Sequence, residues 1–428
     1  MFRFALAIAA FFALVPLVAG AQEQPVPLSL RHAVELALQN NPAYRIVVAG
    51  VDVASARVTQ ARAGLAPTAG LSYTYQYANP VAQLATPFGA LPFGPNATML
   101  PLASATYTLF NPALMAQAGA AAANLAQARA NERDARASTV AAVSRAYYDL
   151  AVAQGSELVT AGAQQLALRH VKDAKQRFAA GQVPRSDVLD ATATAAQRRV
   201  DLIQARNVCV LAQNSLDAIM NVPMQTLHVL ADGFPSSPPG GSIESLVASA
   251  EQTRGEIVAA RASIDAARYT LDAARAGRKA VVTTSISEGN VQPIVQQGFK
   301  AQFIFSLQAV WKVFDGGLAG GAQDEARAEV DRAQFALQKS MNDVELDVRQ
   351  SYASVLSARE RVQATHVFVT AAEESERLAG IRYRGGVGTS LELRDAQMRA
   401  LTAAESYIAA RADFARSIIS LRFAAGLL

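Results

Sequence analysis

The stretch RFAAGQVPRSDVLDA at residues 177–191 lies without gaps on RYRGGVGTSLELRDA at residues 382–396, at an offset of 205 residues. The same offset superposes three apolar positions upstream of each stretch: Val143, Tyr147 and Leu150 on Val348, Tyr352 and Val355. Self-similarity at a fixed offset is the signature of a duplicated structural unit. The sequence therefore predicts two halves that share one plan.

Proline positions predict that each half contains a very long helix. No proline lies between Pro112 and Pro184, and none follows Pro293. Residues 113–178 are rich in good helix formers, and a helix of that length would extend ~100 Å at 1.5 Å per residue. A glycine-bearing turn then reverses the chain into a helix at 185–221. A shorter helix is expected at 43–64. Its length and that of the helix at 185–221 add up to roughly the length of the long helix, so we expect the two to lie end to end beside it.

Two segments of each half alternate in a way that predicts strands. Apolar and polar residues alternate over 71–77, 103–109 and 303–312, and more weakly over 281–287. A soluble half-buried sheet would show the same pattern, but the aromatic content and an export signal favour the lipid-facing wall of a barrel. Four strands cannot close a membrane barrel, and lipid does not tolerate an open edge. The chain must therefore pool its strands with copies of itself, giving eight strands from two copies or twelve from three.

The first residues have the pattern of an export signal. A basic start precedes an apolar run at 4–18, and Ala19-Gly20-Ala21 has the small residues of a cleavage site. We expect a signal peptide at 1–21, a first repeat at 22–232, a linker at 233–242 and a second repeat at 243–428. No cysteine stands directly after the apolar run, so we expect no lipid anchor.

Composition argues against an enzyme. Charged residues are 17% of the chain and the net charge is +4, which is too balanced to predict nucleic-acid binding. The one cysteine, Cys209, excludes an intrachain disulfide, and the four histidines are scattered. The segment GGVGTS at 385–390 looks like a phosphate-binding loop, but it lacks the lysine of a P-loop. We expect no catalytic residue, cofactor or metal site.

Several motifs resemble the TolC-like outer-membrane efflux protein family. They are LRHAVELALQNNP at 30–42, ARAG at 61–64, VFDGG at 313–317 and the two turn stretches. The resemblance covers essentially the whole mature chain. It implies a mainly α fold with membrane β-barrel strands: a homotrimer with a shared twelve-stranded barrel in the lipid of a Gram-negative outer membrane, above a periplasmic tunnel of α-helices.

The resemblance also implies partners and a function. The family docks onto a periplasmic adaptor protein and an inner-membrane transporter, and we expect this chain to pass small molecules to the cell exterior. One alternative is an exit duct for type I protein secretion. Another is a non-transporting periplasmic coiled coil, which would not need the alternating strands.

Acidic residues after each turn predict a channel gate. Glu392 and Asp395 lie three residues apart and share a helix face, and Asp187 and Asp190 have the same spacing. A trimer would multiply them into a ring of carboxylates, although acids at helix N-termini are also stabilised by the helix dipole. By resemblance, Glu392 and Asp395 fall on the family's acidic gate positions. Tyr383 and Asp187 fall on positions that join neighbouring helix pairs in the closed state.

The turns themselves, at 181–186 and 386–391, predict the periplasmic tip and an adaptor-docking surface, the alternative being plain helix-reversal turns. An arginine of the family's latch falls on Gly388. The candidate docking residues are Gly181, Val183, Pro184, Gly386, Gly388 and Ser390. At the other end, the segments 79–101 and 288–300 separate strands and are rich in Pro, Gly, Gln or Asn, so we expect them to face the cell exterior.

Overall fold

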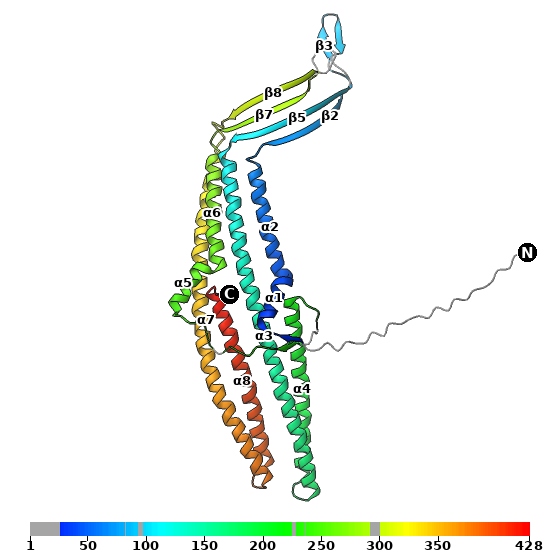
Figure 1. Ribbon diagram of the computed structural model, residues 1–428, viewed down its shortest axis with the longest axis vertical. Coiled ribbons are helices and arrows are strands. Elements are labelled where there is room, and N and C mark those ends of the chain that lie inside the picture. Colours follow the sequence, from blue (N-terminus) through cyan, green and yellow to red (C-terminus); the bar gives the residue numbers. More distant parts are fainter. Residues whose placement is uncertain (1–25, 82, 93–96, 225–227, 236, 292–299) are drawn as a thin grey trace, which may run out of the picture.

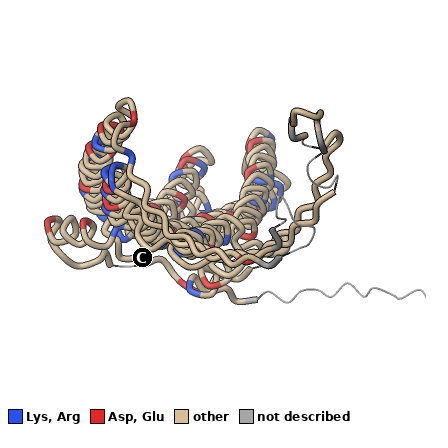
Figure 2. Tube along the Cα trace, turned by 90° about the horizontal axis from the view of Figure 1, so that it is seen from above, with Lys and Arg blue, Asp and Glu red and all other residues tan. Residues whose placement is uncertain are grey.

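The computed structural model describes residues 26–81, 83–92, 97–224, 228–235, 237–291 and 300–428. The predicted signal peptide at 1–21 lies outside these residues. The described chain is an elongated molecule with a four-stranded sheet at one end and two helical hairpins at the other (Figure 1). Seen from above, charged residues gather on the helices, whereas the strands of the sheet carry few (Figure 2).

Two long hairpins form the shaft of the molecule. The first consists of α3 (Pro112–Ala179) and α4 (Arg185–Met220), and the second of α7 (Leu318–Arg384) and α8 (Ser390–Ala424). The first long helix begins where the sequence predicts. Asn111 accepts hydrogen bonds from the backbone N–H groups of Ala113 and Leu114, and Pro112 occupies the first turn, where a missing N–H costs nothing.

Four shorter helices complete the shaft. They are α1 (Leu30–Asn40), α2 (Pro42–Ala63), α5 (Ile243–Thr253) and α6 (Gly255–Ala276). Helices α2 and α4 follow one another along α3, and α6 and α8 do the same along α7 (Figure 1). The predicted end-to-end stacking is therefore confirmed. In the described part of the chain, no helix combines the length and apolar character needed to cross a membrane.

The main sheet is antiparallel and has two chemically different faces. Its strands are β2 (Thr68–Tyr77), β5 (Ala97–Phe110), β7 (Val281–Val291) and β8 (Lys300–Val310), in the order β2-β5-β7-β8. Pairing of Ala105 with Ile286, and of Ile286 with Phe305, places the apolar side chains of successive strands on one face. Ser, Thr and Gln side chains dominate the other face. The apolar face is uncovered: Leu71 is 89% exposed and Phe303 65%.

Both predicted exterior loops are shorter than the sequence suggests. A small hairpin of β3 (Gln83–Thr86) and β4 (Gly89–Pro92) occupies the first, and β5 already begins at Ala97. Pro101 lies inside β5, opposite Tyr73 of β2, because β7 pairs only from Leu102 onward and no ladder bond is lost on that side. The second loop is shortened because β7 continues to Val291, and residues 292–299 lie outside the described residues.

The core lies at the middle of the shaft. Short strand β1 (Val26–Leu28) pairs in parallel with β6 (His228–Leu230), and the fully buried Tyr147 donates a hydrogen bond to the Leu28 carbonyl at 3.0 Å. Val143, Tyr147 and Leu150 are completely buried in this cluster. Their duplicates Val348 and Val355 are buried in a second cluster, with Tyr352 packed against it. The internal duplication thus repeats the packing as well as the sequence.

Candidate functional site: the helical tip

The two reversal turns at the tip have the same backbone geometry. Gly181 and Gly386 have φ values of +68° and +75°, which glycine adopts without strain. The N–H of Gly181 donates to the Phe178 carbonyl at 2.9 Å, and that of Gly386 donates to the Tyr383 carbonyl at 3.2 Å. A Cβ atom at either glycine would meet open space. The glycines are therefore required by backbone conformation, and the surface around them is free.

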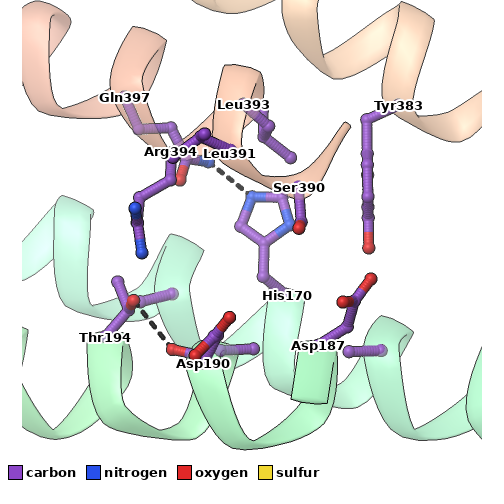
Figure 3. A pocket seen from close by; sticks show the side chains of 13 residues that line it. His170, Asp187, Asp190, Thr194, Tyr383, Ser390, Leu391, Leu393, Arg394 and Gln397 are labelled. Atoms are coloured by element: carbon purple, nitrogen blue, oxygen red, sulfur yellow. Dashed lines mark hydrogen bonds between the residues drawn. The ribbon is translucent and has the colours of Figure 1, made fainter. Parts of the chain in front are cut away.

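A cavity of about 260 Å³ lies between the two hairpins just above the turns. Asp187 and Asp190 line it from α4, and Tyr383 lines it from the end of α7. The phenol of Tyr383 points toward the Asp187 carboxylate (Figure 3). Three of the predicted gate residues are thus brought together within one chain.

Arg177, the first residue of the duplicated stretch, joins the two hairpins. Its guanidinium donates to the Tyr383 and Arg384 carbonyls, each at 3.1 Å, and its central carbon lies 4.9 Å from the centre of the Tyr383 ring. These carbonyls end α7, where the helix dipole favours a positive charge. Sequence reasoning did not assign this role. The available signal was that an arginine occupies this position in both halves, as Arg177 and Arg382.

His170 and Gln397 form a second contact between the hairpins. The His170 Nε2 and Gln397 Nε2 atoms are 2.6 Å apart across the seam between α3 and α8 (Figure 3). Burial lowers the pKa of His170 below its ordinary value of 6.5, and the nearby Asp173 opposes this effect. The imidazole is therefore neutral at pH 7. Sequence analysis found only scattered histidines and missed this contact, which joins residues 227 positions apart.

The predicted acids of the second hairpin lie apart from this cavity. Glu392 and Asp395 are both exposed at the start of α8, and neither lines the space that holds Asp187 and Asp190. The Glu392 N–H donates to the Thr389 hydroxyl, which caps the helix. The Glu392 carboxylate lies 3.9 Å from the Arg382 guanidinium. The four acids therefore form two separate pairs in the chain.

The predicted docking residues occupy the end of the shaft. Val183 and Pro184 lie in the first turn beside Gly181, whereas Ser390 already belongs to α8 and lines the cavity. Gly388 is held close to the preceding helix, because a Cβ atom there would lie 3.0 Å from the Cβ of Arg382. An arginine at position 388 would require the turn to move. No group of His, Cys, Asp and Glu side chains in the described residues is arranged to hold a metal ion.

Comparison with known proteins places this geometry in a family. The sequence model for the outer membrane efflux protein family matches residues 33–222 and 246–427. Protein CyaE of Bordetella pertussis is 29% identical over 413 residues, which cover 94% of this chain and 84% of that protein.

Solved structures share the fold. A membrane protein from Pseudomonas aeruginosa superposes with a TM-score of 0.81 at 21% identity, covering 94% of this chain and 91% of that one. The outer membrane protein VceC of Vibrio cholerae gives 0.77 at 23% identity, covering 93% and 96%. The chain belongs to the outer membrane efflux protein family, whose members are channels, and it has the TolC-like fold of a helical shaft below a barrel sheet.

Proposed function

We propose that three copies of this chain form one continuous channel, each supplying four strands of a twelve-stranded barrel and one third of a helical tunnel. The sheet supports this because its edge strands β2 and β8 run in opposite directions and each has one unpaired side. Joining β8 of one copy to β2 of the next continues the antiparallel order. The apolar face then meets lipid, and the face rich in hydroxyl and amide groups lines the lumen.

The internal duplication supports the same assembly in the shaft. Within one chain, α3 packs against α8. The duplicate of α3 is α7 and the duplicate of α8 is α4, so the equivalent seam would join α7 to α4 of a neighbouring copy. Half-buried His170 and Gln397 meet at the seam within the chain, whereas their duplicates Ser375 and Thr192 are exposed. A head-to-tail interface of this kind closes into a ring when the rotations between successive copies add up to a full turn.

The function that we propose is that of the outer-membrane component of a tripartite efflux system. The observation that carries it is the four-stranded sheet, apolar on one face and polar on the other, joined directly to helices long enough to reach deep into the periplasm. A small molecule delivered by an inner-membrane transporter and a periplasmic adaptor would enter at the helical tip and leave through the barrel. In this proposal the signal peptide 1–21 is removed, and residues 233–242 link the two repeats of the mature chain.

The tip residues have two proposed roles. Glu392 and Asp395, with Asp187, Asp190 and Tyr383, form the gate, because tripling their carboxylates creates a negative constriction. The turns form the adaptor-docking surface, because they end the shaft and leave open space at Gly181 and Gly386. In this arrangement Val183, Pro184, Gly388 and Ser390 shape the same surface.

Three experiments test the channel. The purified chain should require detergent, run as a trimer by light scattering, and conduct ions after insertion into planar bilayers. An epitope inserted after Phe88, in the β3–β4 turn, should be detected on intact cells. A water-soluble monomer would exclude the channel, and an epitope seen only after permeabilisation would reverse the proposed orientation.

Complementation of an efflux-deficient strain, with export of a reporter protein scored in parallel, distinguishes small-molecule efflux from protein secretion.

A further inference from the structure

We propose that Arg382 is an intersubunit clamp that grips the end of α3 of a neighbouring copy, as Arg177 grips the end of α7 within the chain. The inference rests on the proposed trimer, and it assigns a partner surface to a residue whose only recorded side-chain partner in the described chain is Glu392. The occupant of the surface is a second copy of this chain.

The reasoning starts from the contact that already exists. Arg177 donates two hydrogen bonds to consecutive carbonyls at the end of a helix and lies over an aromatic ring. The planar guanidinium suits such a paired acceptor, which an ammonium group could not match. Two of the three partners are main-chain atoms. The site that binds Arg177 therefore depends on the backbone conformation of the turn and on one aromatic ring.

The end of α3 offers a binding site of the same kind, with two main-chain carbonyls and an aromatic ring. The residues equivalent to Tyr383 and Arg384 are Phe178 and Ala179, the last two residues of α3. Each turn closes with a glycine N–H donating to the carbonyl of the aromatic residue, and the next N–H donating to the arginine carbonyl. Phe178 supplies the ring, and its side chain is 46% exposed. Among the described residues, no cation is recorded over the Phe178 ring, which is the position equivalent to that of Arg177 over Tyr383.

The duplicate arginine is equally available. The Arg382 side chain is 61% exposed, in the last turn of α7, on the helix that the repeated seam assigns to a neighbouring α4. The same 205-residue offset that relates α3 to α7 therefore brings Arg382 to Phe178 of the next copy. In that position its charge would interact with the C-terminal carbonyls of α3 and with the ring face of Phe178.

The seam between copies would lack one hydroxyl group that the seam within the chain has, and Arg382 would replace it. Within the chain, the Tyr383 hydroxyl points toward Asp187. The equivalent pair between copies would be Phe178 and Glu392, and Phe178 has no hydroxyl to offer. The Arg382 guanidinium, 3.9 Å from the Glu392 carboxylate, supplies the missing donor and balances the charge. Arg382 would then hold both the neighbouring helix end and its own gate carboxylate, a role that Gly388 cannot fill.

Cysteine cross-linking tests the contact. In a Cys209→Ser background, Arg382→Cys with Phe178→Cys should be joined between chains by a short bis-maleimide reagent, giving covalent dimers and trimers on denaturing gels. The matched pair Arg177→Cys with Tyr383→Cys should be joined within one chain and run as a monomer. A third pair, Ser375→Cys with Thr192→Cys, reports the seam between α7 and α4 away from the clamp.

The three pairs separate the clamp from the assembly. Cross-linking between chains at both Arg382/Phe178 and Ser375/Thr192 supports the clamp. Cross-linking at Ser375/Thr192 alone overturns the clamp while leaving the trimer intact. The absence of any link between chains overturns the seam and the clamp together.

Channel recordings provide a second test. Arg382→Gln should raise the population of open channels at least about tenfold, because each copy loses charge-assisted hydrogen bonds. The open population of Arg382→Lys should lie between that of the unsubstituted channel and that of Arg382→Gln. Arg177→Gln provides the comparison within the chain. Unchanged recordings for Arg382→Gln alongside altered recordings for Arg177→Gln would overturn the proposal.

Discussion

The two helical hairpins have the same architecture but different surroundings. In the first hairpin, α3 already has a partner in α8, and Arg177 and His170 make contacts across that seam. In the second, the equivalent positions on α7 are Arg382 and Ser375, and both are exposed. In the proposed trimer, the seam within the chain is therefore the template for an equivalent seam between neighbouring chains.

The largest expected effect comes from adding bulk to either turn. Trp in place of Gly181 or Gly386 should reduce efflux to the background level while leaving trimers intact, because each glycine borders open space in the proposed docking surface. Efflux is measured as the minimum inhibitory concentration of a transported drug. Ala at the same positions is the matched control, since it adds the strain of a positive φ, about 1–2 kcal/mol, without the bulk. Loss of efflux in the Ala variants as well would point to folding instead of docking.

The second prediction compares the duplicated tyrosines of the core. Tyr147→Phe should lower stability by ~1–3 kcal/mol, because the buried Tyr147 hydroxyl accepts from the Asp232 N–H and donates to the Leu28 carbonyl. Tyr352→Phe should have little effect, since no hydrogen bond of the Tyr352 hydroxyl is recorded in the described chain. Thermal unfolding in detergent measures both. Equal destabilisation by the two substitutions would contradict the prediction that the hydrogen bonds of the Tyr147 hydroxyl account for its larger contribution to stability.

The third prediction concerns the two acidic pairs. Replacing both Glu392 and Asp395 with alanine should reduce the preference for cations in planar bilayers, because both carboxylates are exposed and tripled in the trimer. The matched change at Asp187 and Asp190 should mainly raise conductance, since those residues line the cavity between hairpins. Identical outcomes for the two double variants would show that the two acidic pairs make the same contribution to the gate.

The smallest effect is a pH dependence confined to the seam within the chain. Burial lowers the pKa of His170 below 6.5, so the unfolded chain binds more protons than the folded chain in the interval between the two pKa values. The contribution of His170 to stability should therefore be complete above about pH 6.5 and fall as the pH drops through the folded value. Thermal melts at pH 7.5 and 5.5 measure it. His170→Gln should remove the difference, and Ser375, the duplicate, provides no titratable group.

Sequence alone predicted the helices because proline spacing and helix propensity act locally. It misplaced strand ends for the same reason: Pro101 and Gly289 read as breakers, yet each lies in a strand whose pairing tolerates it. A Cβ atom at Gly289 would lie 2.9 Å from the Pro101 carbonyl oxygen, so the glycine permits close approach of β5 and β7 there. Such tolerance depends on which neighbour is paired at that level, which no local pattern records.

The site was predicted in part. The acids and Tyr383 followed from their spacing and from resemblance, and the structure brings Tyr383 and Asp187 together. Arg177 lies in the duplicated stretch, but no sequence pattern assigns it a role, because its acceptors are carbonyl groups and every residue has a carbonyl. The contact of His170 with Gln397 needed the crossing of α3 and α8 at one level, a property of the packed hairpins.

A clamp that recognises main-chain carbonyls leaves the residues around it free to diverge. Between the two halves, tyrosine at 383 corresponds to phenylalanine at 178, and arginine at 384 to alanine at 179, while an arginine occupies both position 177 and position 382. Because the acceptors belong to the peptide backbone, a substitution on the receiving side removes no hydrogen bond. The side chains of the two halves can therefore change independently while the hydrogen bonds between an arginine and the carbonyls at a helix end are kept.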